Sequence, residues 1–265
     1  MHLSSVLEGP SGILRVPRTA NQWLKGFRRS PEEAVRLLEA LERHGCRVTC
    51  FHYSTVISGC GGDWPRALHL LEAMGVRTIG RDTVVYNSAM SACARGGQWA
   101  LALVLLTRLP QERLVPDSLS LNGLIASAPW PVGLQLLQQE PVDVVSFNAA
   151  MKACSGARQW RMSLRLLQRL QNTLAPDVVS YTVALAGLET SWRTALQLLE
   201  DMATTLQGDC VAYTAAVAVC GRAARWAEAL AIVSGLEGLR CDVATYNALL
   251  TALGNGLEPR RSLES

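Results

Sequence analysis

The sequence is poor in aromatic residues and in charge. Of its 265 residues, 6% are Phe, Trp or Tyr and 18% are charged, whereas 49% are hydrophobic. A composition with so many hydrophobic residues excludes a chain that is disordered along its whole length. The longest uninterrupted apolar run falls far short of the roughly 18 residues that a membrane span needs, so no membrane partner is expected.

Motifs for chemistry are lacking as well. The eight cysteines include no Cys-x-x-Cys pair, and the four histidines are not spaced as metal ligands beside them. Neither a Gly-rich phosphate loop nor a nucleophile elbow is present. We therefore expect no metal, no cofactor and no enzymatic activity, and we expect His44, His52 and His69 on the surface. No secretory signal is visible, which favours reduced thiols.

Tryptophan, although rare, recurs at regular intervals. Six of the seven Trp open the phrase Trp-x-x-small-Leu-x-aliphatic-aliphatic, which begins at Trp64, Trp99, Trp130, Trp160, Trp192 and Trp226. Successive copies lie 35, 31, 30, 32 and 34 residues apart. Internal repeats of this length predict an array of stacked units rather than a single two-layer globule.

A second phrase, Asp-aliphatic-Val-x-aromatic-Asn/Thr, precedes each Trp phrase. Its clearest copies occupy residues 143–148 and 177–182. Apolar residues at helical spacing predict one helix after the Asp and a second helix from the Trp, antiparallel to the first. Asp63 and Ser191 are expected to cap two of the second helices. Because one hairpin cannot cover its own apolar face, stacked hairpins are expected, giving an all-α superhelical solenoid.

The repeats divide the chain as follows. We place an N-terminal segment at 1–14, the solenoid at 15–253 and a C-terminal tail at 254–265. The repeats are 15–49, 50–82, 83–117, 118–143, 144–177, 178–209 and 210–242, with a half repeat at 243–253. Repeat 118–143 is short, and its Pro129 and Pro131 should limit both helices to about three turns and leave a bend or weak joint.

The N-terminal region leaves two alternatives open. Residues 1–30 are basic, which resembles an organelle transit peptide, but the repeat register already begins near residue 15. Either a presequence is very short, or the chain is one piece of a longer product.

These units resemble pentatricopeptide repeats of the P-type. The fullest copy, residues 83–117, reads TVVYNSAMSACARGGQWALALVLLTRLPQERLVPD, with the family's length, Tyr-Asn pair, Ala-Leu face and closing Pro-Asp. The recurrent Trp is not a general family feature and resembles the variant common in algae and protists. The resemblance implies a right-handed α-solenoid that binds single-stranded RNA, one base per repeat.

The resemblance also implies which residues bind the bases. The fifth residue of a repeat bonds the base edge and the closing Asp orients it, which gives the pairs Ser54–Asp82, Asn87–Asp117, Asn122–Asp143, Asn148–Asp177, Thr182–Asp209 and Thr214–Asp242, with Asn247 lacking a closing partner. The second residue sandwiches the base, which gives Phe51, Val84, Leu119, Val145, Val179 and Val211. The family's preferences then predict the core 5′-(purine)UUUGG-3′. An Asn amide supplies both a donor and an acceptor, whereas Thr supplies one hydroxyl.

Other implications are less direct. Arg95, Lys152 and Arg222 are candidate phosphate contacts, or else solvated surface charges. The formal net charge of +3 suits a nucleic-acid partner without requiring one. Family members act largely in mitochondria and plastids, in RNA processing, stability or translation, so a location in one of these organelles and protein partners that carry out processing are implied.

A tetratricopeptide-like scaffold for protein partners is the alternative. It predicts Gly or Ala in the middle of the first helix, where this chain has Ile57, Met90, Ile125, Met151, Leu185, Val217 and Leu250. It also leaves the pairing of Asn, Thr or Ser with a closing Asp unexplained.

Overall fold

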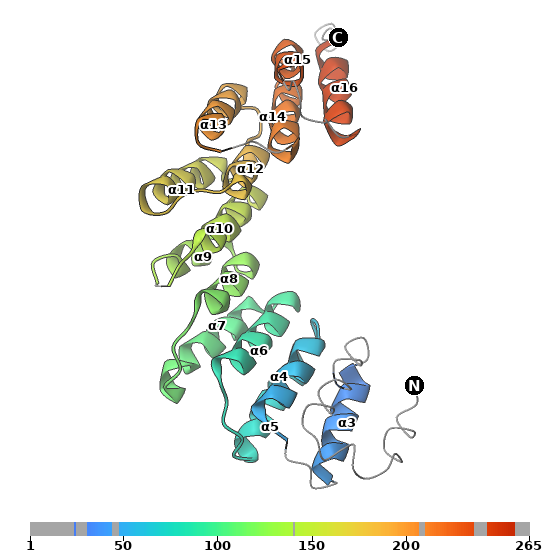
Figure 1. The fold of residues 1–265 in the computed structure, drawn as a ribbon, viewed down its shortest axis with the longest axis vertical. Helices are drawn as coiled ribbons and strands as arrows, with labels where there is room; N and C mark the ends of the chain where they lie inside the picture. The colour runs from blue at the N-terminus through green and yellow to red at the C-terminus, as the bar shows by residue number, and fades with distance from the viewer. Residues whose placement is uncertain are drawn as a thin grey trace, which may run out of the picture. The chain divides into compact units, whose positions relative to one another are not determined.

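The computed structural model describes Leu24 and residues 31–43, 48–139, 141–206, 210–235 and 243–257. Every secondary-structure element in these ranges is helical, as the sequence predicts (Figure 1). The chain divides into two compact units, residues 1–128 and 129–265. This division lies inside repeat 118–143, the shortest repeat.

The first unit contains three first helices that pack side by side. They are α4 (Cys50–Gly59), α6 (Thr83–Arg95) and α8 (Ser118–Ser127), and α4 packs on α6 as α6 packs on α8. The second helices are α3 (Pro31–Arg43), α5 (Trp64–Val76) and α7 (Trp99–Arg108), followed by the short 3-10 helix η2 (Pro110–Glu112). Helices α5 and α7 pack against both neighbouring first helices, which makes a stack of hairpins.

The second unit repeats this arrangement. Its first helices are α10 (Val144–Gly156), α12 (Val178–Gly187), α14 (Cys210–Arg222) and α16 (Val243–Leu257), and each packs on the next. Its second helices are α9 (Trp130–Leu136), α11 (Trp160–Thr173), α13 (Trp192–Thr205) and α15 (Trp226–Ser234). The prediction of stacked antiparallel hairpins is thus confirmed within each unit.

The core of each repeat follows from the two phrases. The aromatic residue after the Asp is buried at Tyr86, Phe147 and Tyr181, although Tyr246 is exposed, and the small residue three positions after the Trp is buried as well. This small residue is fully buried at Ala67, Ala102, Ser163, Ala195 and Ala229. Small side chains let helices approach closely, so the phrase marks where the second helix meets its neighbours.

The first helices end in a recurrent way. The carbonyls of Cys93 and Cys154 accept the N–H five residues further on, from Gln98 and Gln159, both at 2.8 Å. Such a bond is typical of a Schellman C-terminus, in which the residue before the donor takes a left-handed conformation. Gly97 and Arg158 do so, with φ of 73° and 58°. The recurrent cysteines therefore stand at helix ends, where Cys60, Cys93, Cys154 and Cys220 are buried and free.

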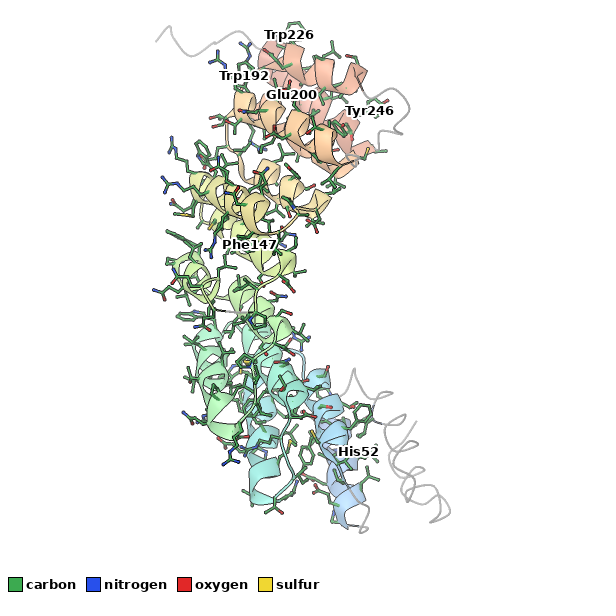
Figure 2. All side chains as sticks on the ribbon, turned by 60° about the vertical axis from the view of Figure 1, so that its left-hand side comes forward. His52, Phe147, Trp192, Glu200, Trp226 and Tyr246 are labelled. Carbon is green, nitrogen blue, oxygen red and sulfur yellow. The ribbon has the colours of Figure 1, made fainter. Side chains whose placement is uncertain are left out.

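Two of the recurrent Trp residues, Trp64 and Trp192, contact the repeat that follows their own. Trp64, at the start of α5, lies against Gly96 at the end of α6, where an added Cβ would come within 2.6 Å of its Cδ1. In the second unit, Trp192 packs against the core that contains Val217 and Cys220 of α14 (Figure 2). The guanidinium of Arg225 lies 4.5 Å from the centroid of the Trp192 ring. The Trp ring therefore forms a seam between consecutive repeats.

The local expectations have mixed outcomes. The predicted cap of α5 is confirmed, since the carboxylate of Asp63 accepts the backbone N–H of Arg66 at 3.4 Å. The predicted cap of α13 is wrong, because the side chain of Ser191 makes no cap hydrogen bond. Helix α9 has 7 residues, about two turns rather than three, although α8 has 10. Helix α16 continues to Leu257, past the boundary predicted at 253.

His52 is buried rather than exposed (Figure 2). Its Nδ1 accepts the backbone N–H of Thr49 at 3.1 Å, because Thr49 replaces the usual Asp before α4 and His52 completes the helix cap.

Candidate nucleic-acid interface

Among the described residues, an aspartate caps each of the four first helices α6, α8, α10 and α12. Its carboxylate accepts the backbone N–H of the third helical residue, which is the bond expected of an N-cap. The distances are 2.9 Å from Val85 to Asp82, and 2.8 Å from Ser120 to Asp117, from Ser146 to Asp143 and from Ser180 to Asp177. The cap uses one carboxylate oxygen of each Asp and leaves the rest of the group able to accept other donors.

Two of these caps also receive an amide from the preceding repeat. In the first unit, Asn87 Nδ2 donates to Asp117 Oδ1 at 3.0 Å and to Oδ2 at 3.1 Å. In the second unit, Asn148 Nδ2 donates to Asp177 Oδ1 at 3.2 Å. The structure therefore brings together the side chains of these two predicted pairs, each across consecutive first helices.

The other predicted pairs differ. Ser54 donates to the Phe51 carbonyl at 3.0 Å, and no hydrogen bond joins its side chain to Asp82 within the described residues. Asn122 belongs to the first unit and Asp143 to the second. Asp209 and Asp242 lie outside the described residues, so the pairs with Thr182 and Thr214 cannot be traced.

The two threonines use their hydroxyl protons inside their own helices. Thr182 Oγ1 donates to the Val178 carbonyl at 2.8 Å, and Thr214 Oγ1 donates to the Cys210 carbonyl at 2.7 Å. Because a hydroxyl carries one proton, Thr182 offers only its lone pairs outward. The hydroxyl of Thr214 also lies 2.7 Å from that of Thr245, and either of the two could be the donor. The Asn and Thr positions therefore present different hydrogen-bonding edges.

The predicted sandwiching residues are exposed although they are apolar. Each stands second in its helix, three positions before the pairing residue, so the two share a helix face. The exposed fractions are 59% for Phe51, 59% for Val84, 68% for Leu119, 57% for Val145, 53% for Val179 and 57% for Val211. A regular row of exposed apolar side chains beside polar ones is a surface suited to flat, amphipathic ligands.

A groove of about 320 Å³ contains these features in the first unit. Asn87 and Asp117 line it together with the apolar Val84 and Leu119, and Arg95 lies at its side. The groove thus combines a hydrogen-bonding pair, two apolar walls and one cation. Asn247, on α16, is exposed.

The three candidate phosphate contacts have different surroundings. Arg95 is exposed beside the groove, and Lys152 is exposed on α10. Arg222 instead donates to the carbonyls of Leu188 at 2.7 Å and Glu189 at 3.0 Å, so its guanidinium already caps the end of α12.

The hydrogen bonds also set the charge of the two paired carboxyl groups. Burial raises the pKa of Asp117, but the bonds from Ser120 and Asn87 outweigh it and hold that pKa below its usual value. The same balance lowers the pKa of Asp177, through Ser180 and Asn148. Both groups are therefore ionised acceptors at neutral pH.

Sequence reasoning missed the part played by serine in these pairs. The hydroxyl of Ser120 lies 2.7 Å from Asp117 Oδ1 and 2.5 Å from Asn87 Oδ1. Ser180 donates to Asp177 Oδ1 at 2.7 Å, whereas Asn148 Oδ1 is buried with no hydrogen-bond partner. The spacing Asp-x-x-Ser, which is that of a capping box, was the available signal.

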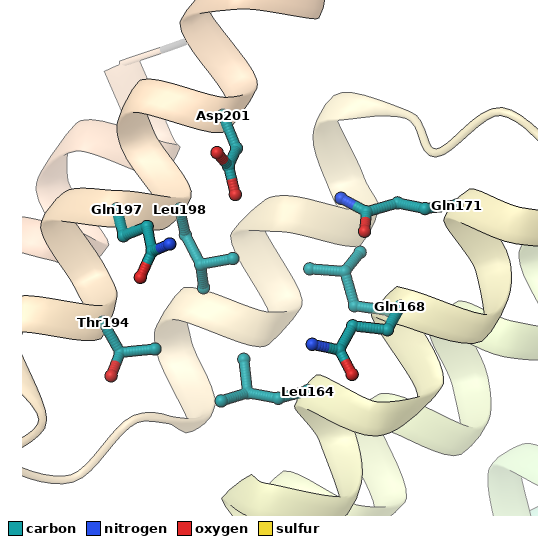
Figure 3. A pocket seen from close by; sticks show the side chains of 8 residues that line it. Leu164, Gln168, Gln171, Thr194, Gln197, Leu198 and Asp201 are labelled. Atoms are coloured by element: carbon teal, nitrogen blue, oxygen red, sulfur yellow. The ribbon is translucent and has the colours of Figure 1, made fainter.

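A second hollow, of about 130 Å³, lies between the second helices α11 and α13 (Figure 3). Gln168 and Gln171 line it from α11, and Gln197 and Asp201 from α13. It contains none of the predicted site residues. Within the described ranges, no group of three or more His, Cys, Asp or Glu could hold a metal ion. No helix of those ranges is long and apolar enough to cross a membrane.

Comparisons with known proteins bear on the family. A model of the PPR repeat matches residues 84–114. A pentatricopeptide repeat-containing protein of Arabidopsis thaliana is 24% identical over 151 residues, which are 54% of this chain and 28% of the relative. The chain therefore spans less than a third of that relative.

A solved structure shows the same fold. The pentatricopeptide repeat protein PPR10 from maize matches with a TM-score of 0.62 and 21% identity, over 96% of this chain and 39% of that one. PPR10 in complex with an 18-nt psaJ RNA element matches with a TM-score of 0.48 and 20% identity, over 89% of this chain and 46% of that one. The chain thus contains a sequence that matches a PPR repeat, is similar to a pentatricopeptide repeat-containing protein, and shares the fold of PPR10.

Proposed function

We propose that the protein binds single-stranded RNA sequence-selectively, with one base per repeat. The proposed core is 5′-(purine)UUUGG-3′, read from the N- to the C-terminus. The pairing residues, in order, are Ser54, Asn87, Asn122, Asn148, Thr182 and Thr214, with the aspartates Asp82, Asp117, Asp143, Asp177, Asp209 and Asp242.

One observation carries the proposal. An Asn amide of one repeat is held by the capping Asp of the next, between two exposed apolar residues, in a groove of the first unit. Helix capping explains the Asp but not the amide beside it, and core packing does not explain exposed Val84 and Leu119. A base that stacks between those side chains would place its Watson–Crick edge at the amide.

The hydrogen-bonding edges agree with the proposed bases. Asn87 gives one N–H to Asp117 and keeps the other, so it can donate to and accept from a uracil edge. The hydroxyl of Thr182 donates its single proton to the Val178 carbonyl. Its oxygen can then only accept hydrogen bonds from a base, which suits the N–H groups of guanine. The distinction between U and G thus rests on which groups remain unused.

Electrostatics supports the affinity only modestly. With a formal net charge of +3, phosphate contacts such as Arg95 would add to binding without dominating it. Contacts of the bases with the row from Phe51 to Val211, in which only Phe51 is aromatic, would supply a further part of the affinity. Lys152 is a further candidate phosphate contact. Arg222 could contact a phosphate only while it also donates to the carbonyls at the end of α12.

The proposed cellular role comes from the family resemblance. It is that of a binding protein rather than an enzyme, in a mitochondrion or plastid, acting in RNA processing, stability or translation. Protein partners would then carry out any processing reaction on the bound RNA.

Selection from a randomised RNA pool, read by a mobility shift, tests the proposal. We expect enrichment of RNA that contains UUUGG, with weak binding to its complement and to DNA of the same sequence. Circular dichroism must show that the protein sample is folded. Absence of enrichment from a folded sample would refute the proposal and leave a scaffold for protein partners as the better interpretation.

A further inference from the structure

A serine of the following repeat completes the Asn87–Asp117 pair. Ser120 is the third residue of α8, and its side chain is buried. Its Oγ lies 2.5 Å from Asn87 Oδ1 and 2.7 Å from Asp117 Oδ1, while Asn87 Nδ2 donates to the carboxylate. The hydroxyl has one proton, and the amide oxygen is the nearer of its two acceptors.

The two bonds to the amide favour the same orientation. Asp117 can only accept, so it faces Nδ2, and the Ser120 proton faces Oδ1. A half-turn of the amide would turn Oδ1 toward the carboxylate and lose the bond to Asp117, and Ser120 would have to give its proton to Asp117 and accept from Nδ2 instead. The one remaining N–H and the one remaining lone pair of Asn87 therefore keep a fixed order.

This order distinguishes the two pyrimidines. Uracil presents an N–H between two carbonyl oxygens, whereas cytosine presents an amino group beside an unprotonated ring nitrogen. Cytosine matches the amide only when the amide oxygen faces its amino group, whereas uracil can match either orientation, so the opposite orientation admits uracil and excludes cytosine. A group that fixes the orientation thus acts on the choice between U and C.

The chain pairs serine with asparagine at this place. The aspartates that follow Asn87, Asn122 and Asn148 are followed, three positions on, by Ser120, Ser146 and Ser180. Those that follow Ser54, Thr182 and Thr214 are followed by Val85, Ala212 and Thr245. Serine is therefore confined to the asparagine repeats, although the hydroxyl of Thr245 lies 2.7 Å from that of Thr214 and makes the equivalent contact there.

Capping does not require the serine. Val85 stands at the equivalent place in α6, and its backbone N–H still donates to Asp82 at 2.9 Å. Helix α6 therefore begins normally without a hydroxyl there. The hydroxyl of Ser120 does accept the backbone N–H of Asp117 at 3.3 Å, which completes a capping box, so its bond to the Asn87 amide is a contact beyond what the cap uses.

We propose that Ser120 is a positioning residue that makes the Asn87 repeat select U over C. This inference rests on the proposed function, because it assumes that the amides meet bases. In the second unit Ser180 bonds Asp177 and not the Asn148 amide, so the same role is not assigned to it.

The variant Ser120→Ala tests the proposal in the full chain. Two RNAs that differ only in U or C at the second base of the core are titrated by fluorescence anisotropy. We expect the preference for U at that base to fall by roughly 3- to 10-fold, which is the effect of one hydrogen bond. Preferences at the other bases should stay unchanged, which a general loss of structure would not produce.

Two further variants serve as controls. Ser127→Ala removes a hydroxyl from the same helix that donates to the Gly123 carbonyl at 3.0 Å, and it should keep the wild-type preference. Ser120→Thr retains the hydroxyl and should restore the preference, since Thr245 is already buried at the equivalent place.

The outcomes separate the two proposals. If the wild-type protein prefers U but Ser120→Ala prefers it equally, the role of the serine is refuted and RNA recognition stands. If the wild-type protein binds neither RNA, the proposed function is refuted, and the role of Ser120, which depends on it, is refuted with it. A fall in the U preference that Ser127→Ala shares also refutes the specific role.

Discussion

Replacing Asn148 with Thr should change the base preference of one repeat. At Thr182 and Thr214 the hydroxyl donates to the carbonyl four residues earlier, at 2.8 and 2.7 Å. A threonine at position 148 would do the same with the Val144 carbonyl. It would then offer acceptors only, and the bond from Asn148 Nδ2 to Asp177 would be lost.

The magnitude follows from counting hydrogen bonds to the base. Uracil loses the N–H donor of the amide, which is about 0.5–1.5 kcal/mol or roughly 3- to 10-fold in affinity. Guanine gains an acceptor for its N–H groups and improves by a similar factor. The preference of G over U at the fourth base should therefore rise by roughly 10- to 100-fold.

The assay is a set of four RNAs that differ only at the fourth base of the core, titrated against wild type and Asn148→Thr. The reciprocal variant Thr182→Asn is the matched control and should move the fifth base from G toward U. A change at several bases would show that the register is wrong. No change at any base would refute the argument that the unused groups of residue 148 select the base.

Two predictions concern stability. Gly96→Ala should lower the free energy of unfolding by about 1–3 kcal/mol, because its Cβ would come within 2.6 Å of Trp64 and 2.7 Å of the Gly62 carbonyl. Gly123→Ala, on α8 with nothing within 4 Å, should instead raise it by about 0.5–1 kcal/mol, and equal urea midpoints for the two variants would contradict this. The pKa of Asp117 lies below its unfolded value near 3.8, so its stabilising contribution is complete above pH 3.8 and is lost as the pH falls through the folded pKa. Unfolding midpoints measured against pH should therefore converge for wild type and Asp117→Asn below pH 3.8, and a constant difference would refute this.

Much of the fold could be predicted because its signals are local. An Asp before an apolar phrase begins a helix, and it does so at Asp82, Asp117, Asp143 and Asp177. A small residue three positions after each Trp marks close helix packing, as at fully buried Ala102. Such rules need only the neighbouring residues.

The features that the sequence did not predict depend on backbone conformation and on contacts between residues far apart in the sequence. Ser191 has a capping side chain, but its backbone, with φ −81° and ψ 65°, departs from the extended form seen at the capping aspartates. Ser54 prefers the Phe51 carbonyl, which competes locally with the distant Asp82. The bond from Ser120 to Asn87 joins residues 33 positions apart, so the capping pattern predicted the serine without its second partner.

The Trp seam has a consequence for exchanging repeats. Trp64 belongs to one repeat by sequence but packs on Gly96 of the next, and Trp192 does the same with the core around Cys220. The unit of sequence and the unit of packing are therefore offset from one another. A chimera assembled from whole repeats would keep every helix cap but would place each Trp ring against a repeat other than its native neighbour. The unit that can be exchanged in this protein is therefore a pair of consecutive repeats rather than a single repeat.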